Sequence, residues 1–163
     1  MIYTRAIFLS KVNLEKALHL HLFYLLFNNR HKYLGGNQLA GKVLIVDDTE
    51  DSRLLLKDLL SYYGYDILEA KTGEEGIMLA SEKKPDLILL DIQMPNMNGV
   101  TVCSILRSNS CTKDIKIIAV TSFAMKGDKE KFLLFGFDGY ISKPIDVQYV
   151  VQLVKEMIGE GGK

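Results

Sequence analysis

The sequence is poor in the residues that staple or interrupt small folds. It has two cysteines, three prolines and no tryptophan among 163 residues. Cys103 and Cys111 are too few for a disulfide scaffold, so we expect a reduced, cytoplasmic setting. Neither sign of charge dominates, because 20 basic residues balance 20 acidic ones, and no direct nucleic-acid binding is expected. A chain of this length with 48% hydrophobic residues can instead bury a core of its own.

Long hydrophobic runs are also missing. The best candidate, residues 17–27, contains two histidines and is shorter than the roughly 20 residues of a membrane-spanning helix, so no transmembrane segment is expected. Residues 1–40 carry five basic groups and one acidic group, for a charge of +4, whereas residues 41–163 carry 15 and 19, for −4. We interpret residues 1–40 as a basic and apolar N-terminal extension of uncertain role. Three interpretations are open: a basic helix that lies at a membrane surface, a helix that docks on a partner protein, or an extension outside the functional unit. We favour the last.

Residues 41–163 alternate between short apolar runs and segments with helical spacing of apolar residues. Apolar runs of this length are typical of parallel strands that are covered on both faces. They predict strands near residues 43–46, 65–70, 87–90, 117–120 and 139–142. The intervening periodicity predicts helices near residues 55–63, 74–81, 100–107, 129–135 and 147–158. Five strand–helix units predict a single doubly wound α/β domain.

Chemically useful side chains follow four of the five expected strands. In chain order they are Asp47, Asp48, Asp91, Thr121 and Lys143. Because open parallel sheets bind ligands beyond the carboxyl ends of their strands, these groups are expected at one edge. Carboxylates brought this close repel unless a cation joins them, and oxygen ligands suit Mg²⁺. Each residue alone has an ordinary explanation, such as a helix cap at Asp48 or Thr49, but their conjunction indicates a site.

Four segments of this region carry a specific combination of motifs in order and with regular spacing. They are VLIVDD at residues 43–48, DLILLDIQMP at 86–95, AVTS at 119–122 and GYISKP at 139–144. Together they resemble the response-regulator receiver domain of two-component signalling. The resemblance covers about residues 41–160 and implies a flavodoxin-like, five-stranded parallel sheet in the order 2-1-3-4-5. Residues 123–128, FAMKGD, further resemble stand-alone cell-cycle regulators and the receivers of hybrid histidine kinases.

The resemblance implies a role for each polar residue at that edge. Asp91 would be the phosphoacceptor, attacking a phosphohistidine on a sensor histidine kinase or a histidine phosphotransfer protein. Asp48 and Asp91 would hold Mg²⁺ by their side chains and Gln93 by its backbone carbonyl, with Asp47 acting through a bound water. Lys143 would pair with the phosphoryl group.

Further positions follow from the same resemblance. The Thr121 hydroxyl would hydrogen-bond to the phosphoryl group, and the small Ser122 would leave room for it. Tyr140 would be an aromatic switch that moves inward with Thr121. The bond between Lys143 and Pro144 would be cis.

These roles predict a single-domain response regulator rather than an enzyme, signalling to a downstream protein target or passing phosphate on as a relay intermediate. Phosphoryl transfer needs mainly positioning and charge neutralisation, so no further base is required. A phosphatase of the haloacid-dehalogenase type, which also forms an aspartyl-phosphate, generally has a second Asp where this chain has Gln93. A flavin-binding domain would need a phosphate-binding loop where this chain has two carboxylates.

A run of four apolar residues, 132–135, predicts the output surface. The run sweeps most of the way round a helix, while a helix lying on a sheet buries only one stripe. We therefore expect Leu133 and Leu134 to form a protein-binding or self-dimerising surface biased by Tyr140. The alternative is a short helix that tucks most of the run under the loop at 136–137. Phe123, where the family places a residue affecting water access, predicts slow self-dephosphorylation.

Overall fold

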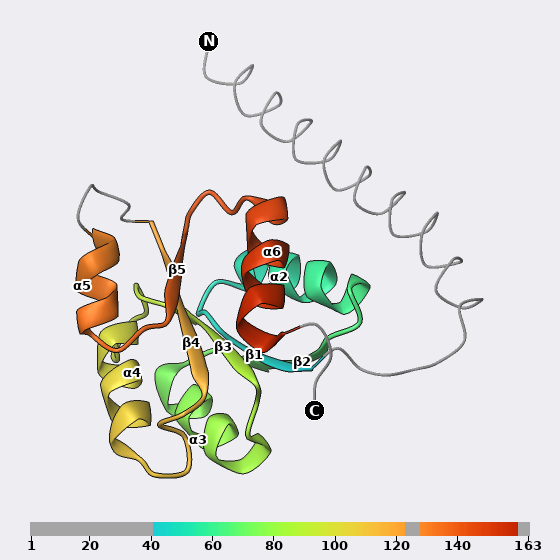
Figure 1. Ribbon diagram of the computed structural model, residues 1–163. Coiled ribbons are helices and arrows are strands. Elements are labelled where there is room, and N and C mark those ends of the chain that lie inside the picture. Colours follow the sequence, from blue (N-terminus) through green and yellow to red (C-terminus); the bar gives the residue numbers. More distant parts are fainter. Residues whose placement is uncertain (1–40, 123–127, 160–163) are drawn as a thin grey trace. The chain divides into compact units, whose positions relative to one another are not determined.

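The computed structural model describes residues 41–122 and 128–159, which fold into a parallel sheet with a helix after each strand (Figure 1). The strands are β1 (Lys42–Val46), β2 (Asp66–Ala70), β3 (Leu87–Asp91), β4 (Lys116–Thr121) and β5 (Gly139–Ser142). The helices are α2 (Glu50–Tyr62), α3 (Gly73–Lys83), α4 (Gly99–Ser108), α5 (Asp128–Leu134) and α6 (Val147–Ile158). The sheet has the order β2-β1-β3-β4-β5 with every pair parallel, which confirms the expected fold class. The expected extension at residues 1–40 lies outside the described residues.

Two layers of helices cover the sheet, and the alternation of side chains along each strand assigns its residues to one layer or the other. In β1, Val43 and Ile45 face a core formed with α2 and α6, whereas Leu44 and Val46 face a core formed with α3, α4 and α5. Figure 1 shows these two groups of helices on opposite faces. Burial on both faces explains why β1 and β3 are continuous apolar runs.

The helix boundaries differ from expectation mainly at α2, which begins at Glu50 rather than near residue 55 and ends one residue earlier than expected. The expected apolar stripe included Tyr63, but α2 ends at Tyr62, and Gly64 at φ +87° turns the chain away. Tyr63 is therefore 38% exposed, and its ring lies 5.1 Å from the Lys155 ammonium. In α6 the expected stripe is correct except at its first residue, Val147, which is exposed.

An arginine fixes the amino ends of β4 and β5, on the edge opposite the candidate site. Arg107 Nε donates to the Gly136 carbonyl at 2.8 Å, and its Nη2 pairs with Asp138 Oδ2 at 2.8 Å. The same carboxylate oxygen accepts the backbone N–H of Ile117 at 2.9 Å. These bonds hold β5 in register with β4. Within the residues that the structure describes, no helix is long and apolar enough to cross a membrane.

Candidate functional site

The strand order brings the expected polar residues to one edge of the sheet. Asp47 follows β1, Asp91 ends β3, Thr121 ends β4 and Lys143 follows β5. Because β1 and β3 are hydrogen-bonded neighbours, the residues that leave them start from adjacent positions. The backbone N–H of Lys143 donates to the Thr121 carbonyl at 2.7 Å, which ties the last two of these residues together.

Three carboxylates form the centre of this edge. One oxygen each from Asp47, Asp48 and Asp91 lies within 4.8 Å of the others, as the sequence predicted. Asp47 and Asp91 are 1% and 3% exposed, whereas Asp48 faces solvent. Three hard oxygen donors with one open side fit a Mg²⁺ ion, which binds a few carboxylates and keeps several waters.

Lys143 provides the positive charge that the two buried carboxylates need. Its Nζ donates to Asp91 Oδ2 at 2.7 Å and to Asp47 Oδ2 at 3.0 Å. Burial alone would lower the pKa of this ammonium, but the hydrogen bonds to the two carboxylates raise it above its usual value. The lysine therefore stays charged at this edge. The peptide bond from Lys143 to Pro144 is cis, as expected.

The electrostatics of Asp91 combine opposing effects. Burial raises the pKa of this carboxyl, and the negative charge of Asp47 acts in the same direction. The hydrogen bond from Lys143 and one from the Gln93 backbone N–H, at 2.9 Å, lower the pKa in part. A further cation at this edge would favour the ionised, nucleophilic form of Asp91.

Asp47 also organises the start of α2. Thr49 occupies the N-cap position, but its side chain makes no capping hydrogen bond. Instead, the Thr49 backbone N–H donates to Asp47 Oδ1 at 2.8 Å. The Asp47 carboxylate therefore forms a turn that leads into α2, and a cap by the Thr49 side chain, the ordinary explanation for that residue, is not present.

Two residues that pack beside the site and support it were missed by the sequence reasoning. Arg53 is buried, and its Nη1 donates to the Asp47 backbone carbonyl at 2.7 Å. Its spacing from Leu56 and Leu60 places it on the buried stripe of α2, and that spacing was an available signal. Gly99 packs so closely beneath β3 that a Cβ there would lie 2.3 Å from the Asp91 carbonyl oxygen.

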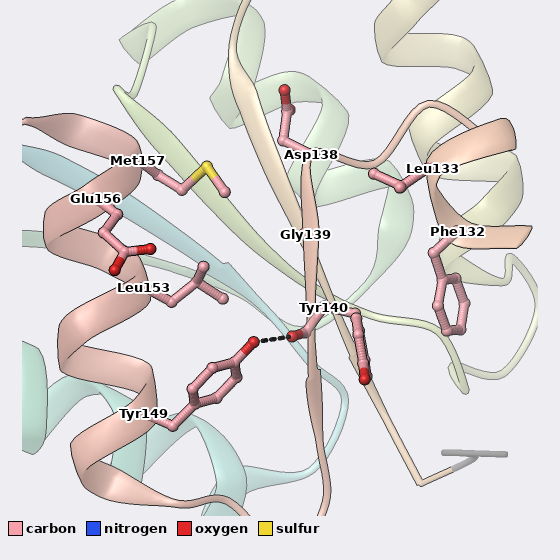
Figure 2. A pocket seen from close by; sticks show the side chains of 9 residues that line it. All are labelled: Phe132, Leu133, Asp138, Gly139, Tyr140, Tyr149, Leu153, Glu156 and Met157. Carbon is pink, nitrogen blue, oxygen red and sulfur yellow. Dashed lines mark hydrogen bonds between the residues drawn. The ribbon is translucent and has the colours of Figure 1, made fainter. Parts of the chain in front are cut away.

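A second feature lies along β5, between α5 and α6. Tyr140 is half-buried and stacks on Phe132, with ring centroids 6.1 Å apart. These rings and side chains of α6 line a pocket with a volume of about 240 Å³. Figure 2 shows the side chains that line it. On the α6 side, the Tyr149 hydroxyl donates to the Tyr140 carbonyl at 3.4 Å.

The apolar run of α5 is mostly exposed. Phe132 is buried, but Leu133 and Phe135 are each 49% exposed and Leu134 is 85% exposed. The expectation that part of the run faces outward is confirmed, and the alternative of a tucked run is wrong. Phe123, the position expected to govern dephosphorylation, lies outside the described residues.

Comparisons with known proteins agree on one family. Residues 43–155 match the model of the response regulator receiver domain. The polar-differentiation response regulator DivK of Brucella anthropi is 42% identical over 118 residues, which is 72% of this chain and 96% of the relative. DivK of Brucella ovis is 42% identical over 122 residues, or 75% of this chain and 99% of the relative.

Solved structures that are similar to this chain belong to the same family. The chemotaxis protein CheY4 of Vibrio cholerae superposes with a TM-score of 0.67 at 27% identity, covering 71% of this chain and 97% of that one. The receiver domain of a signal transduction histidine kinase from Syntrophus aciditrophicus superposes with a TM-score of 0.67 at 31% identity, covering 73% and 90%. With the fold, the motifs and the acidic edge in agreement, this chain belongs to the response regulator receiver domain family of two-component signalling.

Proposed function

We propose that Asp91 is the residue at which this receiver domain is phosphorylated. The supporting observation is its buried carboxylate at the end of β3, with Oδ2 bound by Lys143 and Oδ1 bound by the Gln93 backbone N–H. A carboxylate oxygen of Asp91 attacks the phosphorus of a phosphohistidine on a sensor histidine kinase or a histidine phosphotransfer protein. The new O–P bond replaces the N–P bond, and the imidazole leaves.

The acidic cluster is the proposed metal site. Asp48 and Asp91 would hold Mg²⁺ by their side chains, and Asp47 would act through a water. The resemblance to the family adds the Gln93 backbone carbonyl as a third protein ligand. Bound Mg²⁺ supplies positive charge that offsets both the repulsion between the carboxylates and the charge developing on the phosphoryl oxygens.

The neighbouring residues respond to phosphorylation of Asp91. Lys143, which holds Asp91 in the unmodified domain, pairs with a phosphoryl oxygen once that carboxylate is phosphorylated. Thr121, buried at the end of β4, donates its hydroxyl to the same group. Tyr140 lies two β4–β5 pairing positions from Thr121, since Ala119 pairs with Tyr140 and Thr121 with Ser142, and it acts as the switch.

The output surface is the pocket along β5 together with the exposed leucines of α5. Leu133 lines the pocket together with Tyr140 (Figure 2), and Leu134, the next residue of α5, is 85% exposed. A downstream protein binds this apolar surface. The domain therefore acts through protein contacts and carries out only its own phosphorylation and dephosphorylation. We place it in the cytoplasm, where its free thiols, Cys103 and Cys111, stay reduced.

The test uses a small-molecule phosphodonor, such as phosphoramidate, with the full chain. Wild-type protein should be labelled in Mg²⁺ and not after chelation. Asp91→Asn should abolish the label, and Asp48→Asn should raise the Mg²⁺ concentration required for it. Labelling that is unaffected by chelation, or that persists in Asp91→Asn, would contradict the proposal.

A further inference from the structure

An arginine lies buried beside the acidic cluster without being part of it. Arg53 is 5% exposed in the first turns of α2, and its Nη1 donates to the Asp47 backbone carbonyl at 2.7 Å. Its Nε is also buried and has no hydrogen-bond partner among the residues that the structure describes. This Nε lies 3.9 Å from Glu69 Oε2.

The charge of Arg53 is balanced from the neighbouring edge strand. Glu69 lies in β2, and its other oxygen, Oε1, is 2.5 Å from Lys57 Nζ. Lys57 is one turn along α2 from Arg53, so Glu69 bridges the helix to the strand. This ion pair reduces the cost of burying the guanidinium, but a 3.9 Å contact does not make it a strong bond.

Packing alone does not explain a guanidinium at this position. Arg53 shares the buried stripe of α2 with Leu56 and Leu60, where an apolar side chain would be buried without a desolvation penalty. The specific contribution of the arginine is its hydrogen bond to the Asp47 carbonyl.

That carbonyl belongs to the peptide that joins Asp47 to Asp48. The other polar atoms of Asp47 are all held: Oδ2 by Lys143 at 3.0 Å, Oδ1 by the Thr49 N–H at 2.8 Å, and its own N–H by the Ala70 carbonyl at 3.2 Å. Arg53 holds the remaining atom. The orientation of this peptide plane fixes the direction in which the chain continues to Asp48, whose exposed side chain carries the third carboxylate of the cluster.

We propose that Arg53 is a positioning residue for the divalent cation: by holding the Asp47 carbonyl, it sets the Asp47–Asp48 peptide and thereby aims the Asp48 carboxylate at the metal. This inference rests on the proposed function, which assigns Mg²⁺ to the cluster. Groups that orient metal ligands typically change metal affinity about 10–100-fold when they are removed. Because Arg53 acts through Asp47 and not through Asp91, the phosphorylation rate at saturating Mg²⁺ should change little.

The experiment compares four full-length proteins: wild type, Arg53→Met, Arg53→Lys and Lys57→Met. Methionine keeps an unbranched apolar stem but removes every donor, and lysine keeps a charge with one flexible donor. Lys57→Met is the matched control, because it removes the exposed partner of Glu69 and leaves the Asp47 carbonyl bond intact. Calorimetric titration gives the Mg²⁺ dissociation constant. Phosphoramidate labelling across a Mg²⁺ series separates the half-saturating concentration from the maximal rate.

We expect Arg53→Met to raise both the Mg²⁺ dissociation constant and the half-saturating concentration about 10-fold or more, with a maximal rate within about twofold of wild type. Arg53→Lys should be intermediate, because a lysine does not reproduce the fixed geometry of a guanidinium. Lys57→Met should match wild type. A purely structural role would lower thermal stability without this separation of half-saturation from maximal rate.

Unchanged Mg²⁺ affinity in a folded Arg53→Met would overturn the inference and leave the proposed function intact. A decrease in the maximal labelling rate of Arg53→Met, with no change in its Mg²⁺ affinity, would also overturn the inference. If the wild-type protein itself bound no Mg²⁺, both the proposed function and this inference would be contradicted. If Arg53→Met does not fold, Arg53→Lys decides the matter, with a rise in the dissociation constant of about threefold or more expected and wild-type affinity overturning the inference.

Discussion

Replacing Lys143 with methionine removes the ammonium that contacts both buried carboxylates. The substitution keeps an unbranched stem but deletes the contacts of 2.7 Å to Asp91 and 3.0 Å to Asp47. Removing one partner of a buried ion pair typically costs about 3–5 kcal/mol. The Lys143 side chain is 21% exposed, so water partly solvates its ammonium and the cost should be smaller than for a fully buried pair. We therefore expect the free energy of unfolding to fall by about 2–3 kcal/mol near neutral pH without metal.

The loss should depend on pH, in a direction fixed by Asp91. Burial raises the pKa of this carboxyl and the hydrogen bond from Lys143 lowers it, so deleting the lysine raises the pKa further. A carboxyl whose pKa is higher in the folded than in the unfolded state destabilises the fold above that folded pKa. This cost shrinks as the pH falls from the folded pKa towards the unfolded pKa, because the carboxyl takes up a proton in the folded state first, and it is gone below the unfolded pKa. Lys143→Met should therefore be most destabilising near neutral pH and least destabilising in acid.

Urea denaturation followed by circular dichroism, in chelator at about pH 5 and pH 8, measures both effects. Lys57→Met is the control, because its ion pair with Glu69 is exposed and should contribute little at either pH. Adding Mg²⁺ should stabilise the Lys143→Met protein more than the wild type, since the added cation replaces the missing charge. A loss that is equal at the two pH values, or no greater than that of Lys57→Met, would refute the reasoning.

Three further outcomes follow from packing and exposure. Gly99→Ala should lower the free energy of unfolding by about 2 kcal/mol or more, because its Cβ would lie 2.3 Å from a backbone oxygen of β3; an unchanged urea midpoint would contradict this. In native protein the exposed Cys111 should react rapidly with a thiol reagent, and Cys103 only after unfolding, since burial raises the pKa of Cys103 to about 11; two equally fast thiols would be the contrary result. Leu133→Glu combined with Leu134→Lys should leave folding and phosphorylation intact but abolish phosphorylation-dependent binding or self-assembly in pull-down and sizing, and the surface assignment fails if both persist.

The fold and the centre of the site could be predicted from local pattern. Strands covered on both faces leave continuous apolar runs, and an acidic residue directly after such a run marks the carboxyl end of a strand. Asp47 and Asp91 were found in this way, 44 positions apart in the sequence, because parallel neighbouring strands end at the same edge.

The supporting contacts were harder to predict because they depend on atoms rather than on periodicity. Arg53 has the composition of a surface residue, and only its spacing from Leu56 and Leu60 indicated burial. The way the chain enters α2 depended on its exact path after β1, where the Asp47 side chain accepts the Thr49 backbone N–H. The close packing of Gly99 against β3 likewise follows from the tertiary structure alone.

The central claim is that Asp91 carries the phosphoryl group, and mapping the modified residue tests it most directly. Wild-type protein is phosphorylated in Mg²⁺, treated with borohydride, which reduces an aspartyl-phosphate to homoserine, then digested and analysed by tandem mass spectrometry. We predict homoserine at Asp91, absent when the phosphodonor or Mg²⁺ is omitted. Reduction at Asp47 or Asp48, or at no aspartate in protein shown to be labelled, would contradict the account.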